Sequence, residues 1–172
     1  MLISEAYREE QRILHENPNY GVASVEFAPV VSNIINKFKI AEMLDYGAGK
    51  GRLSESITPS HKVLVCQYDP GVKDISEPPS PCDGLTACID VLEHIEPELL
   101  DNVLDDLQRV TKGLGFYSVH TGPAVKVLSD GRNAHLIQED FRWWMPKLWS
   151  RFDIISMTQT LHGFHVLVRQ WP

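Results

Sequence analysis

LDYGAGKGR, at residues 44–52, carries more architectural information than any other part of the sequence. An apolar run at 41–46 leads into it, and a pattern with helical spacing opens at about Arg52. Glycines at alternate positions let the backbone approach a ligand closely, and the first turn of a helix offers free N–H groups. The pattern predicts a strand, a ligand-binding turn and a helix. The three glycines are Gly47, Gly49 and Gly51.

Neighbouring residues separate four interpretations of this turn. A phosphate-binding P-loop needs GxxxxGK[ST], and here Lys50 comes too early, with no Gly-Lys-Ser/Thr after it. A dinucleotide fold needs GxGxxG, and Arg52 stands where the third glycine should be. A cationic sulfonium cofactor agrees with Asp45, because a carboxylate at the end of a strand favours a cation and disfavours a pyrophosphate. A structural turn without a ligand is the fourth alternative.

Two further polar segments follow strand patterns. Asp69 comes after the strand pattern at 62–67, where an acidic residue can accept hydrogen bonds from ribose hydroxyls. Its alternative role is to form a turn before Pro70. The segment CIDVLEHI, at 88–95, runs out of the strand pattern at 85–89. Because ligands of open α/β sheets bind outside the carboxyl ends of the strands, the two segments and the glycine turn are expected to meet there.

Together these segments resemble the class I S-adenosylmethionine-dependent methyltransferases. The resemblance rests on DYGAGKG (45–51), QYDP (67–70) and CDGLTACIDVLEHI (82–95), the last being similar to the small-molecule enzymes of the ubiquinone-biosynthesis type. Residues 121–145 also resemble a group of small phage and bacterial methyltransferase-domain proteins. The resemblance implies S-adenosylmethionine as cofactor and methyl transfer to a small-molecule acceptor. The implied cofactor-binding residues are Asp45, Gly47, Gly49, Gly51, Asp69, Asp90, Val91 and His94.

Two other functions stay open: methyl transfer to a nucleotide or a protein, and binding of S-adenosylmethionine without catalysis. A small acceptor is favoured because 172 residues leave little room beyond one catalytic domain. The expected organisation is a single methyltransferase domain at 1–172, with an N-terminal helical cap at 1–40 and an acceptor-side insertion at 121–150.

Strand patterns alternate with helical patterns, which predicts an α/β fold with a parallel sheet. The resemblance implies a Rossmann-like class I methyltransferase sheet, mostly parallel, with an antiparallel C-terminal hairpin. Only 13 residues separate Asp69 from Asp83, so the sheet is expected to be shortened after the second strand, with Ser76 or Glu77 facing the adenine. The expected helices span 3–16, 25–38, 52–58 and 97–112; the expected strands span 41–46, 62–67, 85–89, 114–120, 152–161 and 164–170.

Composition restricts the partners and the compartment. A net charge of −7 disfavours a groove built for duplex DNA. No run approaches the roughly 20 apolar residues of a membrane span. Three cysteines without a CxxC pair, and an N-terminus without a signal-peptide core, predict a cytoplasmic protein. The oligomeric state stays open.

Acceptor chemistry is expected at the end of the strand pattern at 114–120. His120 ends it and is the candidate catalytic base, since histidine exchanges protons near pH 7; its alternative is a hydrogen-bonded histidine at a strand end. No metal site is expected, because His162 and His165 lie on a hairpin pattern. Tyr7, Gln11 and His15 are expected to share one face of the N-terminal helix. This face could form a lid over the cofactor, or it could be a polar surface in solvent.

The polar loop that follows supplies candidates for acceptor binding. Lys126 and Arg132 could hold an anionic group, the arginine through its bidentate fork. Trp143 could stack on a planar ring or pack in the core. The full set of expected acceptor-binding residues is Lys126, Arg132, Asn133, His135 and Trp143.

Overall fold

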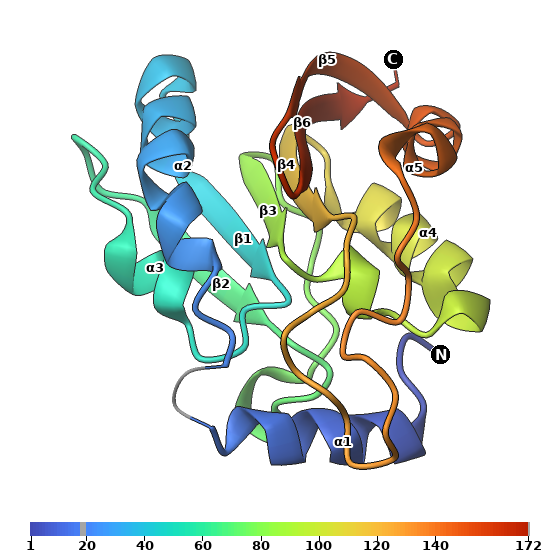
Figure 1. The fold of residues 1–172 in the computed structure, drawn as a ribbon. Helices are drawn as coiled ribbons and strands as arrows, with labels where there is room; N and C mark the ends of the chain where they lie inside the picture. Colours follow the sequence, from blue (N-terminus) through green and yellow to red (C-terminus); the bar gives the residue numbers. More distant parts are fainter. Residues whose placement is uncertain (18–19, 172) are drawn as a thin grey trace.

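The computed structural model describes residues 1–17 and 20–171, and a six-stranded sheet of order β2-β1-β3-β4-β6-β5 forms its centre (Figure 1). The strands are β1 (Glu42–Tyr46), β2 (Leu64–Tyr68), β3 (Leu85–Ile89), β4 (Leu114–His120), β5 (Phe152–Gln159) and β6 (Gly163–Gln170). The helices are α1 (Glu5–His15), α2 (Ser24–Phe38), α3 (Arg52–Ser56), α4 (Leu100–Val110) and α5 (Phe141–Trp149), with 3-10 turns η1 (Lys73–Ile75), η2 (Leu92–His94) and η3 (Pro97–Leu99). Within these described ranges, none of the helices combines the length and the apolar character needed to cross a membrane.

Strand directions confirm the predicted sheet. β1 pairs in parallel with β2 and β3, and β3 pairs in parallel with β4. β6 is antiparallel to both of its neighbours, β4 and β5, and lies between them. The chain therefore closes the sheet with the expected antiparallel hairpin.

Helices cover both faces of the sheet, with α2 and α3 on one side and α4 and α5 on the other (Figure 1). Successive side chains of a strand point to opposite faces. Thus Ala87 of β3 packs in the cluster that contains α2 and α3, whereas its neighbour Cys88 packs with α4 and α5. Both faces are buried, which explains why the strands read as nearly continuous apolar runs.

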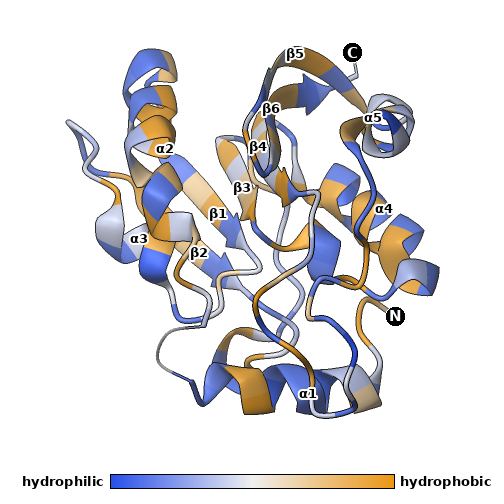
Figure 2. Cartoon of the chain, in the orientation of Figure 1, coloured by the Kyte–Doolittle hydropathy of each residue, from blue (hydrophilic) through white to orange (hydrophobic). Residues whose placement is uncertain are grey.

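Helix α4 packs an apolar stripe on the sheet. Hydrophilic and hydrophobic segments alternate along this helix in Figure 2, as expected where one face is apolar. That buried face fixes α4, and the polar turns that precede it, against the strand ends. Its buried residues are Leu100, Val103, Leu104, Leu107 and Val110.

The expected shortening after the second strand is also present. Between β2 and β3 the chain forms only the 3-10 turn η1 and no strand. β2 is therefore an edge strand, and its side chains Leu64 and Cys66 are exposed. Because β1 pairs in parallel with β2 and β3, the carboxyl ends of the three strands lie on one edge of the sheet.

Helix α1 lies across this edge in Figure 1, with the loop that follows β4 running down onto it. Glu96 accepts hydrogen bonds from the amide and the hydroxyl of Ser4, at 2.8 and 2.6 Å. Glu10 accepts from the amide and the hydroxyl of Ser129, at 2.8 and 2.5 Å. The helix is thus attached at two points and covers the strand ends.

Candidate functional site

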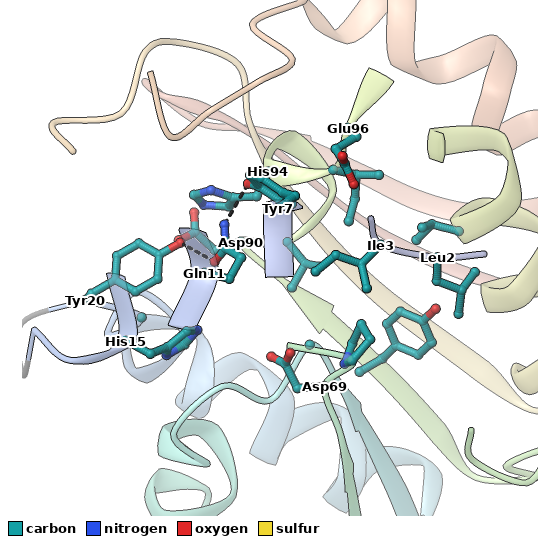
Figure 3. A pocket seen from close by; sticks show the side chains of 17 residues that line it. Leu2, Ile3, Tyr7, Gln11, His15, Tyr20, Asp69, Asp90, His94 and Glu96 are labelled. Atoms are coloured by element: carbon teal, nitrogen blue, oxygen red, sulfur yellow. Dashed lines mark hydrogen bonds between the residues drawn. The ribbon is translucent and has the colours of Figure 1, made fainter. Parts of the chain in front are cut away.

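A cavity of about 780 Å³, counted with its open mouth, lies between α1 and the carboxyl ends of β1, β2 and β3 (Figure 3). In Figure 3, Leu2 and Ile3 lie at one end of the cavity, and the polar side chains of Tyr20, Asp90 and His94 lie toward the other. The cavity therefore offers an apolar part and a polar part to one ligand or to two.

Gly47 lines this cavity at the turn after β1. Its φ is +80°, and an added Cβ would lie only 2.4 Å from Cγ2 of Val91. The amides of Gly47 and Ala48 both donate to the carbonyl of Tyr68, at 2.7 and 3.0 Å, which fixes the turn to the end of β2. Both the backbone conformation and the contact with Val91 exclude a side chain at position 47.

Asp69 connects the same turn to the cavity wall. Its Oδ2 accepts from the amide of Gly49 at 2.9 Å, and its Oδ1 accepts from the amide of Gly71 at 2.8 Å. Each carboxylate oxygen has capacity for a further hydrogen bond. Because Asp69 also lines the cavity, it can hold the turn and accept from hydroxyl groups of a ligand together.

Asp45 is the buried carboxyl group at the end of β1. Only 4% of the residue is exposed, and Oδ2 has no hydrogen-bond partner among the residues described. Burial, and then the charge of Asp69, raise the pKa of Asp45 to about 7. A buried carboxylate without a partner is costly as an ion, so a cation bound near the following turn would stabilise it.

Asp90 stands directly after β3 in a backbone conformation that is rare for a residue with a side chain. Its φ is +59°, and its amide donates to Oγ of Ser118 at 3.1 Å. Such conformations are concentrated at functional sites. The strand end thus directs Asp90 into the wall of the cavity.

Two histidine rings meet beside Asp90. The ring centroids of His94 and His135 lie 4.7 Å apart, edge to face. Nδ1 of His94 lies 2.8 Å from the carbonyl of Ala134, and Nδ1 of His135 lies 2.7 Å from the carbonyl of Gly122. Burial lowers the pKa of both rings, that of His94 to about 4, so both are neutral near pH 7.

Glu93 lies beneath this group and is fully buried. Its Oε1 accepts from the amide of His120 at 2.5 Å, whereas Oε2 has no partner in the described part of the chain. Burial first, and then the charge of Asp90, raise the pKa of Glu93 well above its usual value. The buried carboxyl group of Glu93 is thus a neighbour of the half-buried carboxyl group of Asp90.

Helix α1 contributes a hydrogen-bonded cover to the cavity. Nε2 of Gln11 donates to the hydroxyl of Tyr7 at 2.6 Å, and the hydroxyl of Tyr20 donates to Oε1 of Gln11 at 3.0 Å (Figure 3). The ring of His15 lies over the glycine turn, with Cε1 3.0 Å from the position of an added Cβ on Gly49. This face of α1 therefore lies against the cavity and not on the outer surface.

The cofactor residues expected from the sequence divide into two groups. Asp45, Gly49 and Gly51 do not line the cavity. Gly51 begins α3 and faces the side chain of Gln67. Five of the expected residues do line it: Gly47, Asp69, Asp90, Val91 and His94.

His120, the expected base, is not among the residues that line the cavity. Its Nδ1 accepts from the amide of Gly122 at 3.1 Å, and its ring stacks on that of His162 with centroids 5.7 Å apart. It also contacts the ring of His135, at 4.8 Å. The structure thus places His120 next to His135 and not at the cavity surface.

Most of the expected acceptor-binding side chains are held elsewhere. Asn133 uses its amide on the backbone of Ala124 and His135, and Arg132 pairs with Asp130 on the surface. Trp143 packs against the core cluster under α5. None of these residues lines the cavity, and neither do Lys126, Ser76 and Glu77. Of the five expected acceptor-binding residues, only His135 lies beside Asp90 and His94.

Sequence reasoning missed two acidic residues that organise this region. No role was predicted for Glu93 or Glu96, yet both are buried. The signal available was local: both occur among apolar residues within LEHIE, directly after a strand. Their partners, His120 and Ser4, are distant in the sequence, so the pairing itself was not visible.

No family model matches the chain, and no curated protein matches it. Solved structures do match it. One is the 1,6-didemethyltoxoflavin-N1-methyltransferase of Burkholderia thailandensis, with bound 1,6-didemethyltoxoflavin and S-adenosylhomocysteine: identity is 14%, coverage is 97% of this chain and 89% of that chain, and the TM-score is 0.69. The chain has the class I methyltransferase fold.

Two other solved structures show the same fold. The DhpI–SAH complex is 13% identical, with coverage of 98% of this chain and 99% of that chain and a TM-score of 0.62. The small RNA methyltransferase HEN1 is 10% identical, with coverage of 87% of this chain but 25% of that chain and a TM-score of 0.65. Proteins with the class I methyltransferase fold therefore include those named for a small molecule and for RNA.

Proposed function

We propose that this protein is an S-adenosylmethionine-dependent methyltransferase that acts on a small-molecule acceptor. The observation that carries the proposal is the cavity at the strand ends, where the Gly47 turn and Asp69 meet beside Asp45, whose Oδ2 has no partner among the described residues. Two similar structures contain S-adenosylhomocysteine, which is the cofactor after it has lost its methyl group.

The cofactor is proposed to span the cavity. Its amino-acid part lies at the glycine turn, where the positive charge stabilises the carboxylate of Asp45. The ribose hydroxyls donate to the remaining lone pairs of Asp69. The adenine takes the apolar end, beside Leu2 and Ile3, in place of Ser76 and Glu77, which lie outside. Apolar walls with a few polar groups are typical of such sites.

The acceptor is proposed to occupy the polar end, beside Asp90 and His94. In the reaction, a lone pair of the acceptor forms a bond to the methyl carbon. The carbon–sulfur bond breaks, its electron pair stays on sulfur, and the acceptor loses a proton. Because the sulfonium already activates the methyl group, the protein mainly aligns the reactants and excludes water. The cover of Tyr7, Gln11 and Tyr20 serves the second task.

Helix α1 lies over the cavity, and this cover favours a small acceptor over a polymer. The net charge of −7 also disfavours strong binding to nucleic-acid phosphates. A screen with small molecules and with RNA oligonucleotides, read out as S-adenosylhomocysteine formed, tests the acceptor class. Methylation of RNA alone would overturn the small-molecule assignment.

Calorimetry with S-adenosylmethionine and S-adenosylhomocysteine tests the cofactor. Asp69→Asn replaces an acceptor oxygen with a donor that faces a backbone amide, so we expect affinity to fall by roughly 10- to 100-fold, as for a lost charge-assisted hydrogen bond. Asp74→Asn, at an exposed position in the same connection, is the control and should bind like the wild type. Absence of binding to the wild-type protein at about 1 mM cofactor would overturn the proposal.

A further inference from the structure

Three potential metal ligands converge at the polar end of the cavity. One ligand atom from each of Asp90, His94 and His135 lies within 4.8 Å of the other two. They come from three separate places: the end of β3, the turn η2 and the loop after β4. We propose that Asp90, His94 and His135 form a binding site for a divalent transition-metal ion, and that this site opens onto the cavity.

The hydrogen bonds of both histidines support this assignment. A carbonyl oxygen only accepts, so Nδ1 of His94 must donate to Ala134 and Nδ1 of His135 must donate to Gly122. In a neutral imidazole this leaves the lone pair on Nε2 of each ring. Metal-binding histidines almost always donate their other N–H to a carbonyl or a carboxylate in this way. Both rings are therefore fixed in the tautomer that a metal needs.

Glu93 gives a second, independent indication. Its side chain is fully buried, and its carboxyl group lies against that of Asp90, one of the three proposed ligands. A divalent cation held by Asp90 would supply a positive charge beside these two adjacent carboxyl groups. Glu93 then acts as a positioning residue, because it also holds the amide of His120.

The ligand set indicates the class of metal. Two imidazole nitrogens and one carboxylate oxygen suit manganese, iron, cobalt, nickel or zinc. Magnesium and calcium prefer sets made of oxygen alone. Three protein ligands also leave coordination positions open, as at catalytic sites. Because Asp90 and His94 line the cavity, those positions are available to an acceptor.

This arrangement suggests how an acceptor is chosen, a step that rests on the proposed methyl transfer. A hydroxyl oxygen bound to a divalent metal has a lowered pKa and a fixed position. Its proton leaves to solvent through the open mouth of the cavity when the acceptor binds, before the transfer. A lone pair of the oxygen then bonds to the methyl carbon, the carbon–sulfur bond breaks, and sulfur keeps the electrons of that bond. The site therefore favours an acceptor with a hydroxyl group, and it removes the need for His120 as a base.

Metal binding is tested on the full chain without a polyhistidine tag. After treatment with a chelator, the protein is titrated with Co²⁺, and the visible absorption of the bound ion is recorded. We expect one ion per chain. We also expect the affinity for Co²⁺ to be at least about 100-fold lower in His94→Ala and in His135→Ala, because even the loss of a residue that only hydrogen-bonds to a metal ligand lowers the affinity by up to about 100-fold. His61→Ala, with a ring bonded to the carbonyl of Ile40 outside this group, should bind like the wild type.

Calorimetry with S-adenosylhomocysteine shows whether each variant is folded and separates the two proposals. Variants that lose Co²⁺ but keep S-adenosylhomocysteine binding support the metal site. Absence of a Co²⁺ spectrum in wild-type protein that binds S-adenosylhomocysteine would overturn the metal site alone. If the wild-type protein binds Co²⁺ but does not bind S-adenosylhomocysteine, the proposed cofactor alone is overturned. Equal Co²⁺ affinity in His135→Gln and the wild type would also overturn the ligand assignment.

Discussion

Replacing Gly47 with alanine perturbs the turn that connects the sheet to the cavity. The new Cβ would lie 2.4 and 3.0 Å from the two Cγ atoms of Val91, at a φ of +80°. The left-handed conformation costs roughly 1–2 kcal/mol for a residue with a side chain. Overpacking costs about 1–3 kcal/mol more. The variant should therefore lose about 2–5 kcal/mol of free energy of unfolding.

Two further variants separate these contributions. Gly131 has a φ of +89°, and nothing lies within 4 Å of an added Cβ. Gly131→Ala should therefore lose only the backbone part, about 1–2 kcal/mol. In the Gly47→Ala background, Val91→Ala removes both Cγ atoms and leaves only its Cβ, at 3.2 Å. This second change should recover most of the overpacking cost.

Urea unfolding of the four proteins and of Val91→Ala alone gives the coupling energy directly. Calorimetry with S-adenosylmethionine on the same set measures the effect on the site. The reasoning is refuted if Gly47→Ala destabilises the protein no more than Gly131→Ala does. It is also refuted if Val91→Ala recovers no stability in the Gly47→Ala background.

Two other predictions follow from buried carboxyl groups. Burial raises the pKa of Asp45 to about 7, above its usual value of 3.8, so ionisation of Asp45 destabilises the fold as the pH rises from about 4 to 7. Asp45→Asn should therefore be more stable than the wild type by roughly 4 kcal/mol at pH 8 and equally stable at pH 3.5. Urea unfolding of both proteins without cofactor at the two pH values checks this. The same difference in stability at both pH values would contradict the prediction. Glu96→Gln weakens two hydrogen bonds to Ser4, so amide exchange in α1 should become faster by about 10-fold or more while β4 is unchanged. The exposed neighbour Glu98→Gln is the control, and equal exchange in both variants would show that Glu96 does not hold the helix.

Much of the fold was predictable because its signals are local. The strand, turn and helix around Gly47 follow from an apolar run, glycines and a helical pattern within a dozen residues. The loss of a strand after Asp69 follows from the short distance to Asp83. The expected ends were less accurate: β2 spans Leu64–Tyr68, where the pattern predicted 62–67. Pairing decides where a strand ends, and pairing is not a local property.

The cover shows where local reasoning stops. Helical spacing placed Tyr7, Gln11 and His15 on one face, but a lid and a polar surface have the same spacing. The deciding contact joins Glu10 to Ser129, which are 119 residues apart. The polar loop shows the same limit, because Asn133 looks like a ligand-binding residue in sequence and proves to hold its own loop.

The sequence by itself determined the class of sheet, the glycine turn and the acidic residue after the second strand. Each follows from the chemistry of a few consecutive residues: apolar runs that must be buried, and glycines where a side chain does not fit. Only the tertiary structure brought His135 to Asp90 and His94. The ring of His94 is held by the carbonyl of Ala134, which directly precedes His135 and is 40 positions away from His94 in the sequence. It also removed His120 from the cavity surface. Those outcomes depend on how loops pack over the strand ends, since a side chain's direction is set by partners far along the chain.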